Sequence, residues 1–431
     1  MKRRTVLKLA GGGGMVGSSM VGGYLVVSDR GGACDSDASD HRWCYGVEGT
    51  LDEASQETVF VRERTAGVTR GNGGFFESGP TADGEIVALD AETGEIRWSY
   101  GEAVGMDSYT DLAVSDGVYF GYCTDDDCTD LTALELDGEE RWTRDIDPGY
   151  HQPFVVDGVV YVANDVGPVR ALGAATGETR WDYDLREGES SGGGIAAVTD
   201  VVYVELSSSV VALDRETGDP RWRYEPAGDQ VLTGSTVADG VAYVVTFDQV
   251  AAVDQGDELW RREFEATEGR TEIQAIVSGR LFLLAESGRT EDGRREFRLD
   301  AIDLATGDRD WTTGPLEHSN PEYRPPVDVH DEAVYVSTDR LRALDAATGE
   351  ERWSASLDGG PVQSANVVEE SVGGDHAVFA HAGDRLASFS PDGEKTWEGS
   401  VSGAIRNYLV NESVFVATDE GIYALDRRDN P

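Results

Sequence analysis

A short phrase of apolar and polar positions recurs along the chain and predicts β-structure. Apolar and polar residues alternate in Val211-Ala-Leu-Asp214, with the period of two expected of a strand. Asp-x-x-Thr-Gly follows, a turn sequence in which Asp accepts backbone hydrogen bonds and Gly supplies a positive φ. Arg-Trp then begins another strand. No stretch after residue 30 has the period of a helix, so the sequence predicts an all-β protein. Clear copies of the phrase span residues 85–98, 211–222 and 342–353.

The spacing of the copies predicts a β-propeller of four-stranded antiparallel blades. Eight Trp residues mark the repeat, at a mean spacing of (397 − 98)/7, about 43 residues. An upstream hairpin such as 155–162 gives each repeat a second pair of strands, and such sheets bury both faces only by stacking around an axis. We therefore expect each Trp to lie on an outer strand and pack against the next blade, rather than form a ligand-stacking platform. The repeat tryptophans are Trp98, Trp142, Trp181, Trp222, Trp260, Trp311, Trp353 and Trp397.

These residues resemble the quinoprotein-type (PQQ-like) propeller repeat, with its Ala-x-Asp-x-x-Thr-Gly-x-x-x-Trp signature. Copies at 90–98, 214–222, 303–311 and 345–353 keep a spacing of eight positions from Asp to Trp, whereas Gly173 replaces the Asp before Trp181. The resemblance implies one propeller domain over residues 34–431 and favours eight blades. The C-terminal strands at 407–426 lack a fourth partner, which Arg42-Trp43 could supply. That closure gives nine blades, the alternative count.

The first 33 residues predict an export signal or membrane anchor. Arg3-Arg4 followed by Thr-Val-Leu-Lys8 resembles the twin-arginine signals of haloarchaeal secreted proteins, and no charge occurs from 9 to 28. Cys34 follows Gly31-Gly32-Ala33 and is a candidate for lipid attachment. Cleavage to a free protein and retention of residues 9–28 as an anchor are the alternatives. We therefore expect an extracellular protein or one held on the outer side of the cell membrane.

The charge of the chain excludes one class of partner and indicates the environment. Its 82 acidic and 36 basic residues give a net charge of −46, without the basic footprint that nucleic-acid binding needs. A hydrophobic content of 39% is enough for a folded core. Molar salt shortens the Debye length to about 3 Å and screens the self-repulsion of such a chain. The composition therefore predicts a halophilic, salt-adapted protein, and the acids are too dispersed to predict a cation-binding surface.

One face of the propeller is predicted to bind a partner. The first and third turns of the repeats are tight, whereas long insertions fall in second turns (63–84 and 286–298) and in links between blades (187–194 and 312–326). Variable loops on a rigid scaffold commonly carry binding, although drift on an unconstrained face is the alternative. The candidate contact residues are Phe75, Phe76, His318, Tyr323 and Arg324. Cys123 and Cys128, in another second turn, are a candidate disulfide, and Cys34 could pair with Cys44 unless it carries lipid.

The resemblance also implies an enzymatic alternative, a quinone-dependent dehydrogenase that holds calcium and PQQ over a catalytic Asp. The sequence has no Cys-Cys pair, and no residue matches the calcium or base positions. We therefore predict no catalytic, cofactor-binding or metal-ligating residue. The expected function is that of a monomeric, non-enzymatic binding scaffold at the cell envelope, with another envelope or surface protein as its partner and no nucleic acid.

Overall fold

The computed structural model describes β-strands and turns only, with no helix in the described ranges. None of the described segments is therefore a helix of the length and apolarity needed to cross a bilayer. The described residues form two compact units. Among the described residues, unit 1 comprises those of Asp147–Thr338 and Arg342–Arg352, and unit 2 comprises those up to Ile146, Asp339–Leu341 and those from Trp353 onward. The described residues are 41–45, 49–54, 58–64, 84–101, 108–110, 112–124, 127–146, 152–164, 167–191, 194–228, 230–264, 271–290, 295–316, 324–330, 332–369, 376–410, 413–418 and 420–425.

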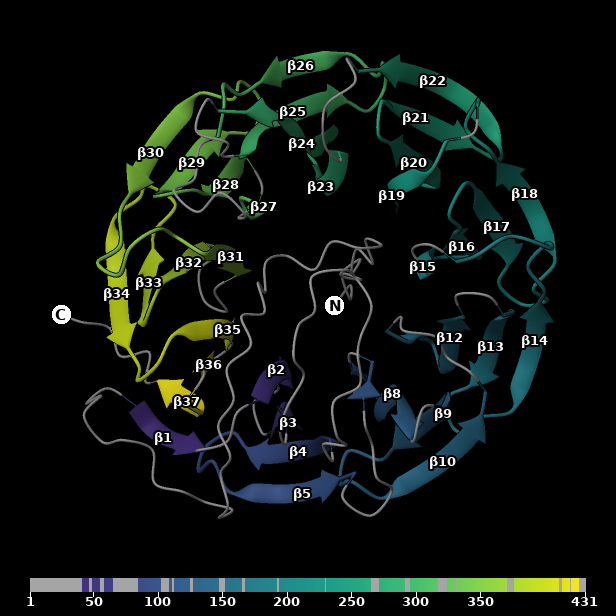
Figure 1. Cartoon of the computed structure of the whole chain (residues 1–431), viewed down its shortest axis with the longest axis horizontal. Coiled ribbons are helices and arrows are strands. Elements are labelled where there is room, and N and C mark those ends of the chain that lie inside the picture. The colour runs from purple at the N-terminus through teal and green to yellow at the C-terminus, as the bar shows by residue number, and fades with distance from the viewer. Residues whose placement is uncertain are drawn as a thin grey trace, which may run out of the picture. The chain divides into compact units, whose positions relative to one another are not determined.

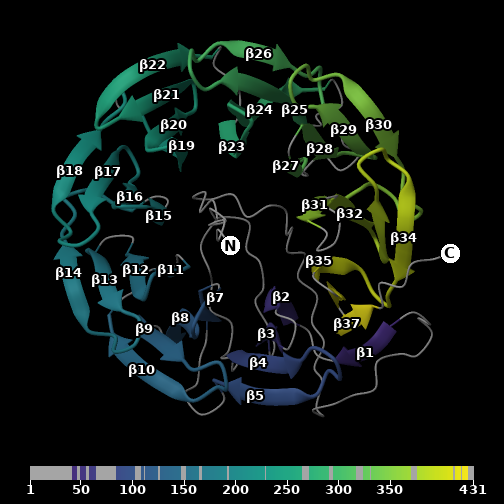
Figure 2. The ribbon, with the colours of Figure 1, turned by 180° about the vertical axis from the view of Figure 1, so that it is seen from behind.

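Unit 1 contains four antiparallel sheets and most of a fifth, each built from four consecutive strands (Figure 1). In both ribbon views the fourth strands β14, β18, β22 and β26 lie together on one side of this unit (Figure 2). The strands are β11 (Phe154–Val156), β12 (Val159–Ala163), β13 (Val169–Gly173) and β14 (Thr179–Tyr183); β15 (Gly194–Val198), β16 (Val201–Glu205), β17 (Val210–Asp214) and β18 (Pro220–Tyr224); β19 (Leu232–Ala238), β20 (Val241–Thr246), β21 (Gln249–Asp254) and β22 (Asp257–Glu263); β23 (Thr271–Val277), β24 (Arg280–Arg289), β25 (Arg295–Asp303) and β26 (Arg309–Thr312); β27 (Val327–His330), β28 (Ala333–Ser337), β29 (Leu341–Asp345) and β30 (Glu351–Ala355).

Unit 2 contains four further sheets of the same kind. In one of them two short strands, β6 and β7, share the first position and both pair with β8. The strands are β2 (Gly49–Ala54), β3 (Thr58–Arg64), β4 (Gly84–Asp90) and β5 (Ile96–Tyr100); β6 (Ser108–Tyr109), β7 (Ala113–Val114), β8 (Val118–Thr124), β9 (Asp127–Leu134) and β10 (Glu140–Asp145); β31 (Ser364–Glu369), β32 (His376–Ala382), β33 (Arg385–Phe389) and β34 (Lys395–Ser400); β35 (Ile405–Val410), β36 (Val414–Thr418), β37 (Ile422–Leu425) and β1 (His41–Tyr45).

The N-terminal strand completes the C-terminal sheet, as Arg42-Trp43 predicted. β1 pairs antiparallel with β37 and becomes the fourth strand of the β35–β37 sheet. Trp43 stands opposite Ala424, the register in which Trp181 stands opposite Ala171 and Trp222 opposite Ala212. The described residues therefore form nine blade-like sheets, which corrects the favoured count of eight to the alternative of nine. The resemblance to the PQQ-like repeat favoured eight blades. The pairing of β1 with β37 instead completes a ninth four-stranded sheet.

The middle strands differ from the predicted alternation. Val210, Val211, Ala212 and Leu213 of β17 are all buried, so both faces of the strand are covered. Its side chains divide between two clusters, one with the preceding sheet and one with the following sheet. A sheet packed on both faces needs apolar residues at every position of its middle strands, whereas the fourth strand β14 buries one residue, Trp181, among more exposed neighbours. The sequence therefore predicted the strands correctly, but not the two-sided burial.

The repeat tryptophans join neighbouring sheets, as their spacing predicts. Trp181 lies on the fourth strand β14, is almost fully buried, and donates its indole N–H to the carbonyl of Arg215 in the next sheet, at 2.9 Å. A buried indole N–H needs such an acceptor. The same bond recurs from Trp98 to Leu136, Trp260 to Leu304, Trp311 to Ala346 and Trp353 to Pro391, at 2.7–3.0 Å.

Candidate interaction rim

Each sheet has two ends that differ in chemistry. The first and third turns lie at one end, which we call the repeat rim, and in unit 1 backbone bonds join them, as from the amide of Ala174 to Gly158 and from that of Leu304 to Gly279. The second turns and the links between sheets lie at the other end, which we call the variable rim. The turns of the repeat rim are regular and hydrogen-bonded to one another, whereas the longer connections of this chain lie at the variable rim.

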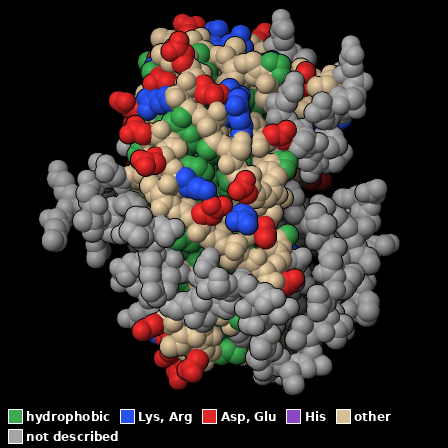
Figure 3. Space-filling model, turned by 90° about the vertical axis from the view of Figure 1, so that its left-hand side faces the viewer, with side chains coloured by type: hydrophobic (Ala, Val, Ile, Leu, Met, Phe, Trp, Pro, Cys, Tyr) green, Lys and Arg blue, Asp and Glu red, His purple; other side chains and the backbone are tan. Residues whose placement is uncertain are grey.

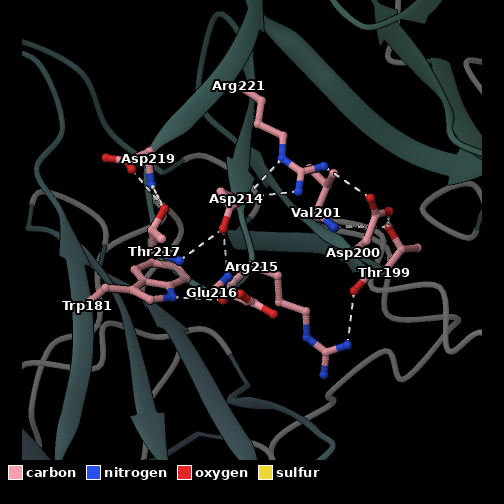
Figure 4. Close-up of polar contacts among 10 residues, drawn as sticks. All are labelled: Trp181, Thr199, Asp200, Val201, Asp214, Arg215, Glu216, Thr217, Asp219 and Arg221. Carbon is pink, nitrogen blue, oxygen red and sulfur yellow. Dashed lines mark hydrogen bonds and ion pairs between the residues drawn. The ribbon is translucent and has the colours of Figure 1, made fainter.

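The third turns of the repeat rim are closed by one recurring network (Figure 4). Asp214 accepts the amides of Glu216 and Thr217 through Oδ1, at 2.9 and 3.0 Å. Its Oδ2 accepts Arg221 at 2.9 Å, and Arg221 also reaches Asp200 of the first turn. The Arg221 guanidinium and these amides lower the pKa of Asp214 to about 2. The Asp214 carboxylate and the Arg221 guanidinium therefore both have partners within the sheet, which favours a structural role.

The variable rim is joined by backbone hydrogen bonds from one sheet to the next. In unit 1 the amide of Ser207, in a second turn, donates to Ser190 in the preceding link, and the amide of Leu232 donates to Ser207. In unit 2 the amide of Ile405 donates to Gly383 of the preceding sheet. Loops held in this way lose little conformational entropy when a partner binds.

Ion pairs hold the links of unit 1 in place. Glu189, in the 187–194 link between β14 and β15, accepts Arg223 of the next sheet, and Arg223 also donates to Ser209 of a second turn at 2.8 Å. Both charged side chains are largely buried. This neighbouring guanidinium lowers the pKa of Glu189 against the opposing effect of burial. The described residues 187–191 of this link are therefore a fixed part of the rim.

The 286–298 insertion is not a loop, which corrects the prediction. β24 and β25 extend through it as a paired hairpin, with Glu286 opposite Phe297 and Arg289 opposite Arg295. Buried Glu286 pairs with Arg295, so strand extension satisfies the backbone that a loop would have left exposed.

Arg324, a predicted contact residue, is turned toward its own protein. It pairs with Glu272 of β23, and its guanidinium carbon lies 5.6 Å from the ring centroid of Phe297. The 312–326 link is also tied down at Leu316, whose amide donates to the Phe297 carbonyl at 2.7 Å. Arg324 therefore secures the link against the sheet and is not a freely presented contact, because a cation beside a buried carboxylate and an aromatic ring is stabilised there.

Two exposed apolar side chains on the variable rim were missed by the sequence analysis. Val231 and Phe247 are 54% and 46% exposed, although most large apolar residues among those described are buried. They flank the cross-strand pair of Leu232 and Thr246, so they stand opposite each other at the end of the β19–β22 sheet. The signal in the sequence was Phe247, an aromatic residue in a second turn, where the neighbouring sheet has Ser207-Ser208.

The other predicted contact residues lie outside the described residues, namely Phe75, Phe76, His318 and Tyr323. So does Cys34. Cys123 and Cys128 lie on β8 and β9, on either side of a second turn as predicted, but their side chains are not described, and their disulfide stays a prediction. Cys44 of β1 is disulfide-bonded, and its partner is not among the described side chains.

A comparison with protein-family models identifies the family to which the chain belongs. The family model described as outer membrane protein assembly factor BamB, a PQQ-like repeat model, matches residues 82–231 and 207–430. The chain belongs to this BamB-type PQQ-like family. The match contains seven of the nine described sheets completely and parts of the other two, and it includes every repeat Trp from Trp98 to Trp397.

Two relatives show how differently this BamB-type repeat is used. The chain is 26% identical over 283 residues to the outer membrane protein assembly factor BamB of Burkholderia pseudomallei, covering 57% of this chain and 68% of that protein. It is 31% identical over 157 residues to the serine/threonine-protein kinase AfsK of Streptomyces griseus, covering 32% of this chain but 19% of the kinase. The chain therefore spans only about a fifth of the kinase.

A solved structure supports the fold. The quinohemoprotein alcohol dehydrogenase ADHIIG of Pseudomonas putida HK5 superposes with a TM-score of 0.51 at 15% identity, over 82% of this chain and 74% of that one. This likeness shows the β-propeller fold of the BamB-type chain and nothing of its chemistry.

The described residues do not fit the calcium that quinoprotein dehydrogenases hold. Calcium takes six to eight oxygen ligands, several of them carboxylates. Within the described ranges no three His, Cys, Asp or Glu side chains converge in a way that could hold a metal ion. The buried carboxylates Glu286 and Asp300 are each paired with arginine instead.

Proposed function

We propose that this chain is an exported, non-enzymatic β-propeller scaffold that binds another protein of the cell envelope through its variable rim. The observation that carries the proposal is the exposed pair Val231 and Phe247, set on a rim whose turns and links are fixed by backbone bonds and ion pairs. Membership of the BamB-type family supports an envelope location and a protein partner.

The chemistry of the rim suits a protein partner. Aromatic and apolar side chains surrounded by polar groups are the usual centres of binding energy in protein interfaces. Asp248 follows Phe247, and its carbonyl accepts the Phe264 amide at 2.6 Å, so the turn that carries Phe247 is held on both sides. We infer that Phe247 inserts into an apolar pocket of the partner.

Replacing Phe247 with serine should weaken binding of the partner about 30-fold, because truncating an interface aromatic costs about 2 kcal/mol. The full chain, tagged at the C-terminus beyond Leu425 and purified in molar salt, would be used to capture proteins from solubilised native membranes. Affinity for the captured partner would then be measured by titration at the same salt.

Leu259→Ser is the matched control. Leu259 is 57% exposed in the same sheet but lies on the fourth strand β22, away from the variable rim. The proposal predicts that Leu259→Ser binds like the parent chain. Equal losses in the two variants, or none in Phe247→Ser, would contradict a role for the variable rim.

The alternative function, a quinoprotein dehydrogenase, is supported by a 30% identity over 161 residues to the quinohemoprotein alcohol dehydrogenase of Comamonas testosteroni. It predicts a quinone absorbance and dye reduction after PQQ and calcium are added in high salt. The scaffold proposal predicts neither. Either signal from the pure full chain would favour the enzyme.

We also propose that the acidic surface is an adaptation to salt. Acidic side chains are intermixed with scattered basic side chains on the face drawn in Figure 3, and the whole chain carries a net charge of −46. Dilution from molar to millimolar salt should therefore lower the melting temperature, because self-repulsion is no longer screened. A scanning calorimetry series in NaCl tests this, and a melting temperature that stays constant with salt would refute the adaptation.

A further inference from the structure

An arginine recurs at one position of the fourth strands, directly before the repeat tryptophan. In the sheet that ends with β10 this residue is Arg141, whose guanidinium donates to Glu135 of the third turn at 2.7 and 2.9 Å. It also donates to the hydroxyl of Tyr119 and to the carbonyl of Asp116 in the first turn, each at 2.7 Å. A third-turn carboxylate, a tyrosine hydroxyl and a first-turn oxygen therefore surround one guanidinium. We call this arrangement the arginine socket.

Among the described residues of unit 1, four of the five sheets place a guanidinium at this position or directly across from it. Figure 4 shows Arg221 between Asp214 of the third turn and Asp200 of the first turn. In the β23–β26 sheet the charges are exchanged, because Asp310 precedes the tryptophan and Arg280 of β24 donates to it at 2.7 Å. The four arginines are Arg180, Arg221, Arg280 and Arg352.

The β19–β22 sheet has an apolar residue, Leu259, where these sheets have a charged one. Leu259 and Arg141 each directly precede the tryptophan that stands opposite an alanine of the third strand, so they occupy equivalent positions. The side chain of Leu259 is 57% exposed and has no group that could donate to a carboxylate. By the same register Asp254 is the counterpart of Glu135. The third-turn carboxylate of this sheet is therefore present, but its arginine is not.

The tyrosine of the socket is also present. Tyr243 and Tyr119 stand opposite the same alanine position, and their rings lie 6.1 and 6.2 Å from the ring of the repeat tryptophan. Tyr243 is only 4% exposed, and burial, together with the charge of Asp239 in the first turn, raises its pKa. No described residue forms a hydrogen bond with the Tyr243 hydroxyl, and none forms an ion pair with Asp239 or Asp254. A buried hydroxyl and two carboxylates are thus left without the cation that the equivalent groups hold.

We propose that this edge of the β19–β22 sheet is a socket for an arginine side chain of another protein. A planar guanidinium offers five donors that can reach a carboxylate and a hydroxyl together, and its apolar stem can pack on Leu259. Contact ion pairs at a partly buried site are screened less by salt than separated charges are. The socket lies next to a third turn, at the repeat rim, and is therefore separate from Phe247 on the variable rim. Leu259→Ser leaves its acceptors in place and remains a valid control for the variable rim.

The NMR signal of Tyr243 would report occupancy of the socket. The full chain, labelled with ¹³C at the ζ carbon of tyrosine, would be titrated with acetyl-leucyl-arginine amide at the lowest salt concentration in which it remains folded. Tyr243→Phe assigns the signal. The matched probe is acetyl-leucyl-citrulline amide, which keeps the shape of the arginine side chain but has no charge. We expect the arginine peptide to shift the Tyr243 signal with a millimolar dissociation constant, because it makes few contacts, and the citrulline peptide to leave the signal unchanged.

Three variants separate the socket from general attraction to an acidic surface. Leu259→Arg should abolish the shift, because its own guanidinium fills the socket, whereas Leu259→Met should bind like the parent chain. Asp254→Asn should weaken binding about tenfold, through loss of a charged hydrogen bond. The melting temperature of each variant confirms that it is folded.

An equal shift with the citrulline peptide, undiminished binding by Leu259→Arg, or no shift with the arginine peptide would overturn the proposal. Phe247→Ser leaves the socket intact and should bind the peptide like the parent chain. Failure of the variable-rim proposal is therefore distinguishable from failure of the socket.

Discussion

Replacing Gly218 with alanine should destabilise the protein by about 3–5 kcal/mol, the cost of displacing a buried aromatic side chain. A Cβ at Gly218 would lie 2.7 Å from the Trp181 ring, where no real Cβ is found. Gly218 also has a φ of +77°, a conformation that alanine disfavours. Trp181 must then leave its site between the sheets and lose its bond to the Arg215 carbonyl. Urea unfolding in molar salt measures the change.

Gly158→Ala is the matched control for this prediction. Gly158 has a similar φ of +72°, but nothing lies within 4 Å of a Cβ there. The alanine should cost only about 1–2 kcal/mol, from the positive φ alone. In a chain that already carries Trp181→Leu, the destabilisation caused by Gly218→Ala should decrease to the same value of about 1–2 kcal/mol. Equal losses at the two glycines in the parent chain would show that tryptophan docking contributes little to stability.

Acidification from pH 6.5 to pH 4 should lower the free energy of unfolding by roughly 3 kcal/mol through the protonation of His381 alone. This side chain is 3% exposed, with Ser364 Oγ 2.7 Å from its Nδ1 and the Tyr408 ring against it. Burial lowers its pKa from 6.5 to about 4, against a raising effect from the backbone at Ile405. The unfolded chain therefore binds a proton in this range and the folded chain does not. The stabilisation is complete above pH 6.5 and is lost as pH falls toward 4.

The double variant His381→Val and Ser364→Ala should remove this part of the pH dependence. Val245 of β20 occupies the equivalent position in another sheet, so the site accepts valine. Ser364→Ala alone retains the histidine and should retain the slope. The measurement is the free energy of unfolding against pH at constant molar salt. An unchanged slope in the double variant would assign the acid sensitivity to other groups.

The position of the variable rim could be predicted from the sequence, but only some of the residues that matter there could be. Uneven loop lengths located the variable rim, and the 187–194 link and the second turn between Cys123 and Cys128 lie where predicted. Arg324 stays a predicted contact residue, but its pairing with Glu272 and Phe297 could not be predicted, because both partners lie far away in sequence. Val231 and Phe247 were missed because their exposure depends on cross-strand register, which a turn sequence does not reveal.

The sequence by itself determined the class and repeat of this protein, because Asp-x-x-Thr-Gly turns, Trp spacing and strand patterning are local properties that each sheet of about 43 residues repeats. Only the tertiary structure decided the number of sheets and the two-sided burial of strands such as β17. The physical reason is that these properties depend on which edges and faces meet. Pairing of β1 with β37 joins residues more than 370 positions apart, from His41 to Leu425, and no local pattern specifies such a contact.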